Sequence, residues 1–255
     1  MASGDVQDTS VEKISDLELP ATSSVPRSLN ALDFVVKNAP PTICYIPNFI
    51  DTDFEDILIN HVNDAPKPKW EFLKNRRLQN WGGIVGKKSL IADNSMPDWL
   101  NIVIDRIMEV ENTFPESNRP NHVLVNEYLP GQGIMPHTDG PAFFPTVCTV
   151  SLGSHTLLDL FEPWDEKNPK AFPERYVGSM LLQPRSLILI RGEAYESHLH
   201  GIADRTADEI TEKIFNRPAK LTPGIGLERG TRISLTIRNV PNVNTKLMNS
   251  LFGRK

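Results

Sequence analysis

The stretch that decides the fold, residues 231–238, has the sequence TRISLTIR, and from Arg232 onward polar and apolar residues alternate. Successive side chains of a β-strand point to opposite faces of its sheet. The apolar face of this strand would carry Ile233, Leu235 and Ile237. The polar face would carry Arg232, Ser234, Thr236 and Arg238. The pattern therefore predicts a strand with one face in a hydrophobic core and a polar face that is either solvated or lines a cavity.

Further short β-rich runs precede this strand in the second half of the chain. Together with the run that contains it, they are separated by Pro and Gly and cover residues 122–129, 147–152, 156–161, 179–182, 186–190 and 231–240. Such spacing is typical of a β-sandwich or barrel. Before them we expect a strand at 42–46, a helix capped by Asp51 or Asp53, and an amphipathic helix within 97–114. We therefore predict an α+β protein, mainly β: a double-stranded β-helix (jelly roll) core with flanking N-terminal helices.

The composition divides the chain into an arm and one domain. Of the 255 residues, the first 38 contain six acidic and three basic residues and show no sustained hydrophobic periodicity. Such a segment cannot bury enough apolar surface to order itself. We predict a flexible acidic N-terminal arm at 1–38 and a single catalytic-sized domain at 39–255.

Several classes of protein are excluded by the same composition. No run approaches the ~20 apolar residues of a membrane span, and the first residues show no apolar signal-peptide run, so we expect no membrane association. The two cysteines, Cys44 and Cys148, are too few for a disulfide framework or a cysteine-based zinc site, which favours a reducing intracellular compartment. A net charge of −5 argues against binding nucleic acid through global charge, although it leaves room for a local basic patch.

A histidine and a carboxylate stand two residues apart at His137 and Asp139. On an extended chain they share a face, and with one more histidine they would form the facial triad that holds Fe(II) and leaves positions open for a co-substrate and dioxygen. From the residues alone the third ligand remains open. The candidates are His155, His198 and His200. The alternative is a turn-forming aspartate beside a surface histidine.

Other polar residues on predicted strands suit an anionic ligand. An arginine on the polar face of residues 231–238 would bind a carboxylate through its planar fork. Arg232 and Arg238 lie roughly 20 Å apart on a straight strand, so they would hold opposite ends of a short dicarboxylate, or one would brace a metal ligand. Asn126 and Tyr128 share a face and would add neutral donors.

Five short motifs occur together and in one order along the chain. They are Asn126-x-Tyr128, His137-x-Asp139, Ser151-Leu152-Gly153-Ser154, His200-Gly201-Ile202 and Arg232-x5-Arg238. In this set and order, residues 40–241 resemble the AlkB-like Fe(II)/2-oxoglutarate dioxygenases. The resemblance implies an oxidoreductase that uses Fe(II), with 2-oxoglutarate and O2 as co-substrates, to demethylate N-alkylated bases of RNA or DNA.

The resemblance also implies roles for individual residues. His137, Asp139 and His200 would be the catalytic iron ligands, and the His-Gly-Ile motif selects His200 over His198. Arg232 would bind the far carboxylate of 2-oxoglutarate, in a pocket completed by a set of polar residues: Asn126, Tyr128, Ser234 and Arg238. Two features depart from relatives: Ser234 stands where some carry an amide, and residues 204–229 form a longer, charge-neutral excursion expected over the barrel rim.

Residues 67–88 form a basic segment, with seven basic residues and one acidic residue, a local charge of +6. Basic groups follow phosphates and aromatic faces stack on bases, so this composition suits a single-stranded RNA or DNA surface. The AlkB-like family places a nucleotide-recognition lid here, in which residues 79–83 would be a flexible turn. The substrate candidates are Lys74, Arg76, Arg77, Trp70 and Trp81. The alternative is a solvated charged face with its aromatics in the core.

Two other functions remain open at this stage: a protein or small-molecule hydroxylase of the same superfamily, and a nucleic-acid-binding module with weak turnover. Nothing in the sequence calls for an obligate protein partner. We expect the protein in the cytoplasm and nucleus.

Overall fold

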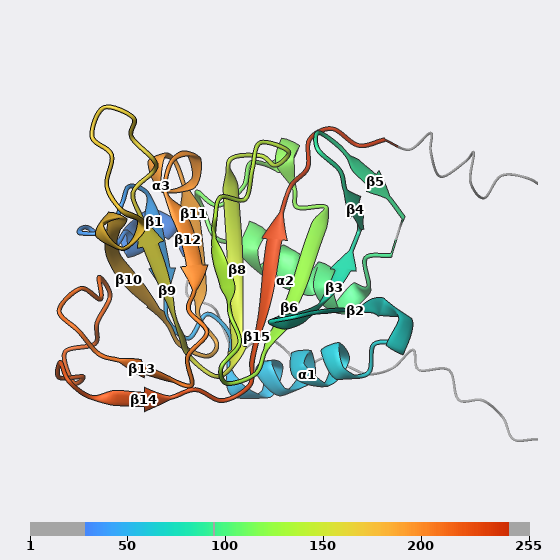
Figure 1. Cartoon of the computed structure of the whole chain (residues 1–255). Coiled ribbons are helices and arrows are strands. Elements are labelled where there is room, and N and C mark those ends of the chain that lie inside the picture. The colour runs from blue at the N-terminus through green and yellow to red at the C-terminus, as the bar shows by residue number, and fades with distance from the viewer. Residues whose placement is uncertain (1–28, 94, 245–255) are drawn as a thin grey trace, which may run out of the picture.

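The computed structural model describes residues 29–93 and 95–244, which form two antiparallel sheets that face each other (Figure 1). In spatial order the larger sheet contains β1 (Ile43–Ile46), β11 (Leu187–Arg191), β8 (Thr146–Gly153), β15 (Arg232–Arg238), β6 (His122–Tyr128), β3 (Arg76–Trp81) and β2 (Trp70–Leu73). The smaller sheet contains β10 (Tyr176–Leu182), β9 (Thr156–Phe161), β12 (Leu199–Ile202) and β7 (Ile134–His137). This arrangement confirms the predicted jelly-roll core.

Shorter elements surround the two sheets. Two small ribbons pair β4 (Gly83–Val85) with β5 (Leu90–Ala92) and β13 (Ala207–Glu209) with β14 (Gly226–Glu228). The described α-helices are α1 (Thr52–Asn63), α2 (Asp98–Met108) and α3 (Glu193–Glu196). The described 3-10 turns are η1 (Ala31–Phe34), η2 (Lys67–Lys69), η3 (Glu116–Asn118) and η4 (Phe172–Arg175). None of the described helices combines the length and apolar character that a membrane span requires.

The flanking helices form as their sequence pattern predicts. The side chain of Asp51 caps α1 by accepting a hydrogen bond of 2.8 Å from the backbone N–H of Phe54. The apolar stripes of α1 and α2, with Leu58 and Ile104 among them, pack with the apolar face of β15 in one buried cluster. The predicted strand face of Ile233, Leu235 and Ile237 therefore lies in a core on the helix side of the larger sheet.

The opposite face of β15 points into the space between the two sheets. A second buried cluster joins the sheets there, with members such as Leu158 and Leu160 from β9 and Ile188 and Ile190 from β11. The polar residues of β15 line a cavity in this space. The alternation in TRISLTIR thus places the apolar side chains of β15 in a hydrophobic core and its polar side chains on the wall of a cavity.

The folded body begins earlier than predicted. Ala31 is completely buried, the side chain of Asn30 accepts the backbone N–H of Leu32, and Val35 pairs with Cys44 of β1. Residues 29–38 therefore belong to the domain, because they pack on β1 and α2, which sequence periodicity does not reveal. The remainder of the predicted arm, residues 1–28, lies outside the described residues.

The prediction of a flexible turn at residues 79–83 is wrong. β2 and β3 form a hairpin, and β3 pairs with β6, so the basic segment extends the larger sheet. Gln79 is fully buried, donates to the carbonyl of Val62 at 2.8 Å and accepts from the indole of Trp81 at 2.9 Å. The chain turns only at Gly82, where a φ of +89° and the carbonyl of Asn121 leave no room for a side chain.

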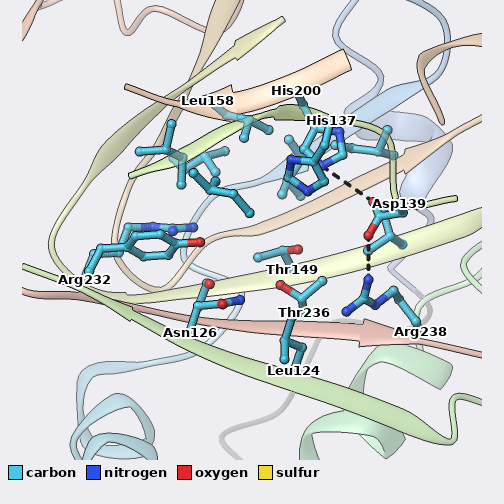
Figure 2. A pocket seen from close by; sticks show the side chains of 18 residues that line it. Leu124, Asn126, His137, Asp139, Thr149, Leu158, His200, Arg232, Thr236 and Arg238 are labelled. Atoms are coloured by element: carbon cyan, nitrogen blue, oxygen red, sulfur yellow. Dashed lines mark hydrogen bonds and ion pairs between the residues drawn. The ribbon is translucent and has the colours of Figure 1, made fainter. Parts of the chain in front are cut away.

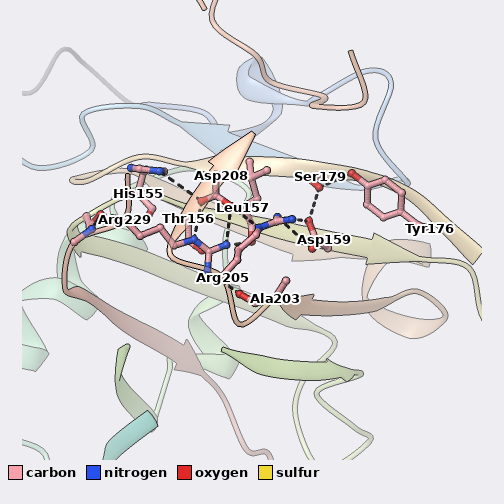
Figure 3. Close-up of polar contacts among 12 residues, drawn as sticks. His155, Thr156, Leu157, Asp159, Tyr176, Ser179, Ala203, Arg205, Asp208 and Arg229 are labelled. Atoms are coloured by element: carbon pink, nitrogen blue, oxygen red, sulfur yellow. Dashed lines mark hydrogen bonds and ion pairs between the residues drawn. The ribbon is translucent and has the colours of Figure 1, made fainter. Parts of the chain in front are cut away.

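The excursion at residues 204–229 is held together by one buried carboxylate, that of Asp208 (Figure 3). Asp208 accepts hydrogen bonds from Arg205 at 2.8 Å and from two nitrogens of Arg229 at 2.7 and 2.8 Å. Burial raises the pKa of Asp208, but the bonds and charges of the two arginines outweigh it and hold this pKa below its ordinary value. The predicted charge-neutral segment is therefore an ordered ribbon, β13–β14, held by internal ion pairs.

Candidate active site

A cavity of about 90 Å³ lies between the two sheets, and Figure 2 shows the side chains that line it. Its walls come from strands that are distant in sequence, chiefly β6, β7, β12 and β15. Among its lining residues are all eight predicted iron and co-substrate residues: Asn126, Tyr128, His137, Asp139, His200, Arg232, Ser234 and Arg238. The fold therefore brings together in one place what the sequence spreads over more than a hundred residues.

The two predicted histidine ligands meet through strand pairing. His137 of β7 lies directly opposite His200 of β12, and their ring centroids are 4.6 Å apart. Nδ1 of His137 lies 2.8 Å from the carbonyl oxygen of Met135, so this nitrogen donates and Nε2 is the ring nitrogen left to face a metal. Burial lowers the pKa of His200 to about 4, despite the nearby charge of Asp139, so this imidazole is neutral as a ligand must be.

Asp139 supplies a carboxylate beside the histidines. Its Oδ1 accepts a hydrogen bond of 2.7 Å from Arg238, and its Oδ2 is 3.6 Å from Nε2 of His200. Burial raises the pKa of Asp139, but the charge of Arg238 outweighs it, with help from both histidines, and the pKa lies below its ordinary value. The carboxyl group is therefore an ionised oxygen donor.

The donor set fits Fe(II), although the side chains are not yet in ligating positions. Among the described residues, no three His, Cys, Asp or Glu side chains are arranged so that they could hold a metal ion as they stand. Oδ1 of Asp139 is held by Arg238, whereas Oδ2 faces Nε2 of His200 at 3.6 Å. Two neutral imidazoles and one carboxylate are the facial set that suits non-haem iron.

Arg232 lies at the other end of the cavity and fits an anionic co-substrate (Figure 2). It is only 3% exposed, donates to the hydroxyl of Ser151 at 2.9 Å, and stands 5.7 Å from the ring centroid of Tyr128. Its Nε has no hydrogen-bond partner, and no described acidic side chain forms an ion pair with it. Burial lowers the pKa of Arg232 to about 10. A buried cation without a counter-ion is costly, and a bound carboxylate would supply one.

Arg238 lines the same cavity and has a charged partner there. Its position on the cavity wall agrees with the sequence, and its guanidinium pairs with Asp139. Of the two arrangements left open, the structure shows the one in which Arg238 braces the predicted metal ligand. Ser234 lies in register between Asn126 of β6 and Ser151 of β8, in the middle of the polar wall.

The structure also excludes two of the three histidines considered as the third metal ligand, and it shows one residue near the site that sequence reasoning missed. His198 is buried outside the cavity, with Nδ1 3.4 Å from the carbonyl oxygen of Glu193, and His155 stands 3.5 Å from Asp208. The hydroxyl of Tyr195 donates to the carbonyl of Gly140 at 2.9 Å and so holds the loop after Asp139. No sequence signal marks Tyr195, because the contact bridges 55 residues.

The candidate substrate residues on the β2–β3 hairpin fall into two groups. Lys74 is exposed at its tip, whereas Arg76 donates to the Asn126 side chain at 3.1 Å. Arg77 forms a bidentate pair with Glu127, both bonds 2.7 Å long, and its guanidinium covers the ring of Trp70 at 4.0 Å. These inward contacts follow from the pairing of β3 with β6, which sets Arg77 opposite Glu127.

The two tryptophans are not free stacking platforms. Trp70 and Trp81 both pack against the helix-side core, and Lys69 covers the Trp81 ring at 4.0 Å. The alternative interpretation, aromatics that face the core, is therefore correct for both. The exposed aromatic of the hairpin is Phe72, which is 73% exposed.

Comparisons with known proteins agree with this geometry. The model of the 2OG-Fe(II) oxygenase superfamily matches residues 67–238, and the chain belongs to this family. It is 45% identical over 215 residues to "Probable RNA/DNA demethylase ALKBH6" of Danio rerio, which covers 82% of this chain and 90% of that protein. The resemblance to AlkB-like enzymes is thereby confirmed.

More distant relatives share the domain. The chain is 26% identical over 216 residues to the mouse protein "tRNA (carboxymethyluridine(34)-5-O)-methyltransferase ALKBH8", covering 79% of this chain but only 31% of that protein. The solved structure of OsALKBH1 has the same fold, with a TM-score of 0.51 at 18% identity over 79% of this chain and 99% of that one. The protein is thus a 2-oxoglutarate-dependent dioxygenase that uses Fe(II), 2-oxoglutarate and O2.

Proposed function

We propose that His137, Asp139 and His200 hold Fe(II) and that Arg232 binds the far carboxylate of 2-oxoglutarate. The observation that carries this proposal is the arrangement of one cavity. Metal-donor side chains lie at one end, and at the other end lies a buried arginine that has no counter-ion among the described residues. Asn126, Tyr128 and Ser234 lie between the two ends and offer neutral hydrogen bonds to a dicarboxylate.

Each residue of the site has a defined task in this reaction. Arg232 orients 2-oxoglutarate, Arg238 keeps Asp139 ionised and in place, and the apolar walls from β9 and β11 exclude water. Bound iron would supply oxygen activation, in which 2-oxoglutarate loses carbon dioxide to give succinate and one oxygen atom enters the substrate. A hydroxylated N-methyl group leaves as formaldehyde.

We further propose that the substrate is an N-alkylated base in single-stranded RNA or DNA. Two relatives support this: the Danio rerio protein is named a probable RNA/DNA demethylase, and the mouse protein is named a tRNA methyltransferase. The hairpin that carries Lys74 and Phe72 at the surface is the third support. The hairpin would act as the recognition lid, because its strand β3 pairs with β6, the strand that carries Asn126 on the cavity wall. Single strands suit this surface because the base need not be extracted from a duplex.

The test is mass spectrometry of nucleosides after incubation of the protein with iron, 2-oxoglutarate and N-methylated oligonucleotides of RNA and DNA. Loss of the methylated nucleoside in step with succinate formation is the expected result, and Asp139→Ala is the matched inactive control. If succinate forms but no methylated nucleoside is consumed, the substrate is a protein or a small molecule instead. If strands bind without any succinate, the protein is a binding module.

We propose a cytoplasmic and nuclear location, because nucleic-acid substrates are found in both compartments and the two cysteines, Cys44 and Cys148, are buried free thiols. Microscopy of the tagged full chain tests this, and exclusion from either compartment would contradict it.

A further inference from the structure

A second cavity, of about 220 Å³, lies on the outer side of the smaller sheet, and we call it the outer cavity. It shares Ile134 of β7 and Ile202 of β12 with the active-site cavity, so only this strand pair separates the two. Alternate side chains explain the division: His137 and His200 line the inner cavity, whereas Met135 and Gly201 line the outer one. The outer cavity is therefore placed directly behind the predicted iron ligands.

The walls of the outer cavity suit a flat ring. Phe172 of η4 stacks on Phe161 of β9, with centroids 4.7 Å apart and an angle of 26° between the rings. Phe172 keeps 43% of its surface exposed, and Met135 keeps 79%. Gly201 has no side chain that would fill the cavity. A Cβ at this position would lie 2.9 Å from the backbone of Pro136, so the strand pair has no room for one. Apolar surface of this kind, exposed around a cavity, is typical of a ligand site.

The polar groups of the outer cavity are mostly hydrogen-bond acceptors. Asp159 accepts from the hydroxyl of Ser179 at 2.6 Å through Oδ1, while its Oδ2 has only a long contact of 3.5 Å with Arg205 (Figure 3). Burial raises the pKa of Asp159 in spite of these two partners. Asp204 adds a second carboxylate at the rim. Such acceptors suit the exocyclic amino groups of a nucleobase.

The edge position of β7 connects the outer cavity with the substrate. β7 is the last strand of the smaller sheet, and Pro136 within it removes one backbone donor from that edge. A base that enters the active site is turned away from its neighbour, so the two bases of one nucleotide step can lie on opposite sides of a single edge strand. Asn75, at the tip of the basic hairpin, lines the outer cavity, which brings the neighbouring Lys74 to the side where a phosphate would pass.

We propose that the outer cavity binds the unmodified nucleobase next to the target base, stacked on Phe172 and Met135, with its amino group on Asp159. This inference rests on the proposed nucleic-acid substrate. It predicts that the protein reads two adjacent positions of a single strand, one in each cavity. Pyrimidine or purine neighbours with an exocyclic amino group would bind more tightly than uridine or thymidine, which lack one.

The experiment combines a protein change with the matching change in the strand. Fluorescence anisotropy measures the Kd of a single-stranded oligonucleotide with one N-methylated base, and of two versions that are abasic on its 5′ or its 3′ side. For the unchanged protein, one abasic strand should bind about 5- to 150-fold more weakly, the range for one lost base stack. Phe172→Ala should weaken the complete strand by a similar factor and leave that abasic strand unaffected.

Two further variants keep the test decisive. Met135→Ala should act in the same direction, and its exposed side chain is not needed for folding. Ile225→Ala removes an exposed apolar side chain that does not line the outer cavity, so it should change neither Kd. Thermal melts of all variants check that each is folded.

Three outcomes would overturn the inference. If Phe172→Ala weakens the binding of the abasic strands as much as that of the complete strand, the outer cavity does not hold a base, although the proposed substrate class survives. If an arginine-rich peptide competes while abasic strands bind normally, the cavity takes a protein side chain. If the unchanged protein binds no strand at all, both the inference and the proposed substrate fail.

Discussion

Replacement of Arg232 is the most informative perturbation of the co-substrate pocket. Arg232→Lys keeps the charge but loses the planar fork that matches a carboxylate. Loss of one charge-assisted hydrogen bond costs about 1.5–3 kcal/mol, which corresponds to a rise of roughly 10- to 150-fold in the Kd and KM for 2-oxoglutarate. Binding of Fe(II) should change little, because Arg232 lies at the far end of the cavity from the histidines.

Arg232→Met separates binding from stability. Since Arg232 is buried without an acidic partner among the described residues, an apolar replacement should leave the Tm of the ligand-free protein unchanged or raise it. For the unchanged protein, 2-oxoglutarate at 100 times its Kd adds about 2.7 kcal/mol, a rise in Tm of roughly 5–11 °C for a chain of this size. Arg232→Met should lose that rise.

The assay is an anaerobic thermal melt with Fe(II), with and without 2-oxoglutarate, alongside the KM for 2-oxoglutarate in uncoupled turnover. Arg191→Met is the matched control, because Arg191 donates to the backbone of Asn112 and does not line the cavity. An Arg232→Met protein that keeps both the ligand-induced rise and its KM would refute the assignment of Arg232 to the co-substrate carboxylate.

Three further predictions follow from the same geometry. His200→Ala should abolish 2-oxoglutarate turnover, whereas His198→Ala should retain most of it; the reverse order would show that the wrong histidine was assigned. Phe72→Ala should weaken single-strand binding about 5- to 150-fold with an unchanged salt slope, and Lys74→Gln should reduce the log–log slope by about 0.7, as salt titrations by anisotropy would show. Asp208→Asn should cost about 3–5 kcal/mol at pH 7, because Arg229 stays buried without its partner. Since the pKa of Asp208 is depressed, its stabilisation exists above the unfolded pKa of about 3.9 and is lost as pH falls through the native pKa, so denaturant melts of variant and parent should converge at acid pH. Parallel pH curves would contradict that ion pair.

The larger sheet could be predicted from sequence where strands carry strong alternation. β15 shows it, and in the smaller sheet β9 was predicted with its observed bounds, 156–161. β7 and β12 escaped prediction because each has four residues and contains a poor strand former, Pro136 or Gly201. Their pairing is nevertheless what sets His137 opposite His200, so the motifs located the site although the strands that carry it were not recognised.

The hairpin shows where local reasoning fails. Residues 79–83 contain Gln, Asn and two Gly, which favour a turn, but pairing with β6 and a hydrogen bond to α1 override that preference at Gln79. The bidentate pair of Arg77 with Glu127 joins residues 50 positions apart, and only the register of the sheet reveals it. A count of basic residues in the sequence therefore overestimates how many cations on this surface lack an acidic partner.

Anaerobic calorimetric titration of Fe(II) into the protein, with 2-oxoglutarate present, tests the central claim most directly. The account predicts one Fe(II) per chain, little change in His198→Ala, and a loss of most of the affinity in Asp139→Ala, since two histidines alone cannot fix the facial geometry. Unchanged iron affinity in Asp139→Ala, with the protein folded, would contradict the account.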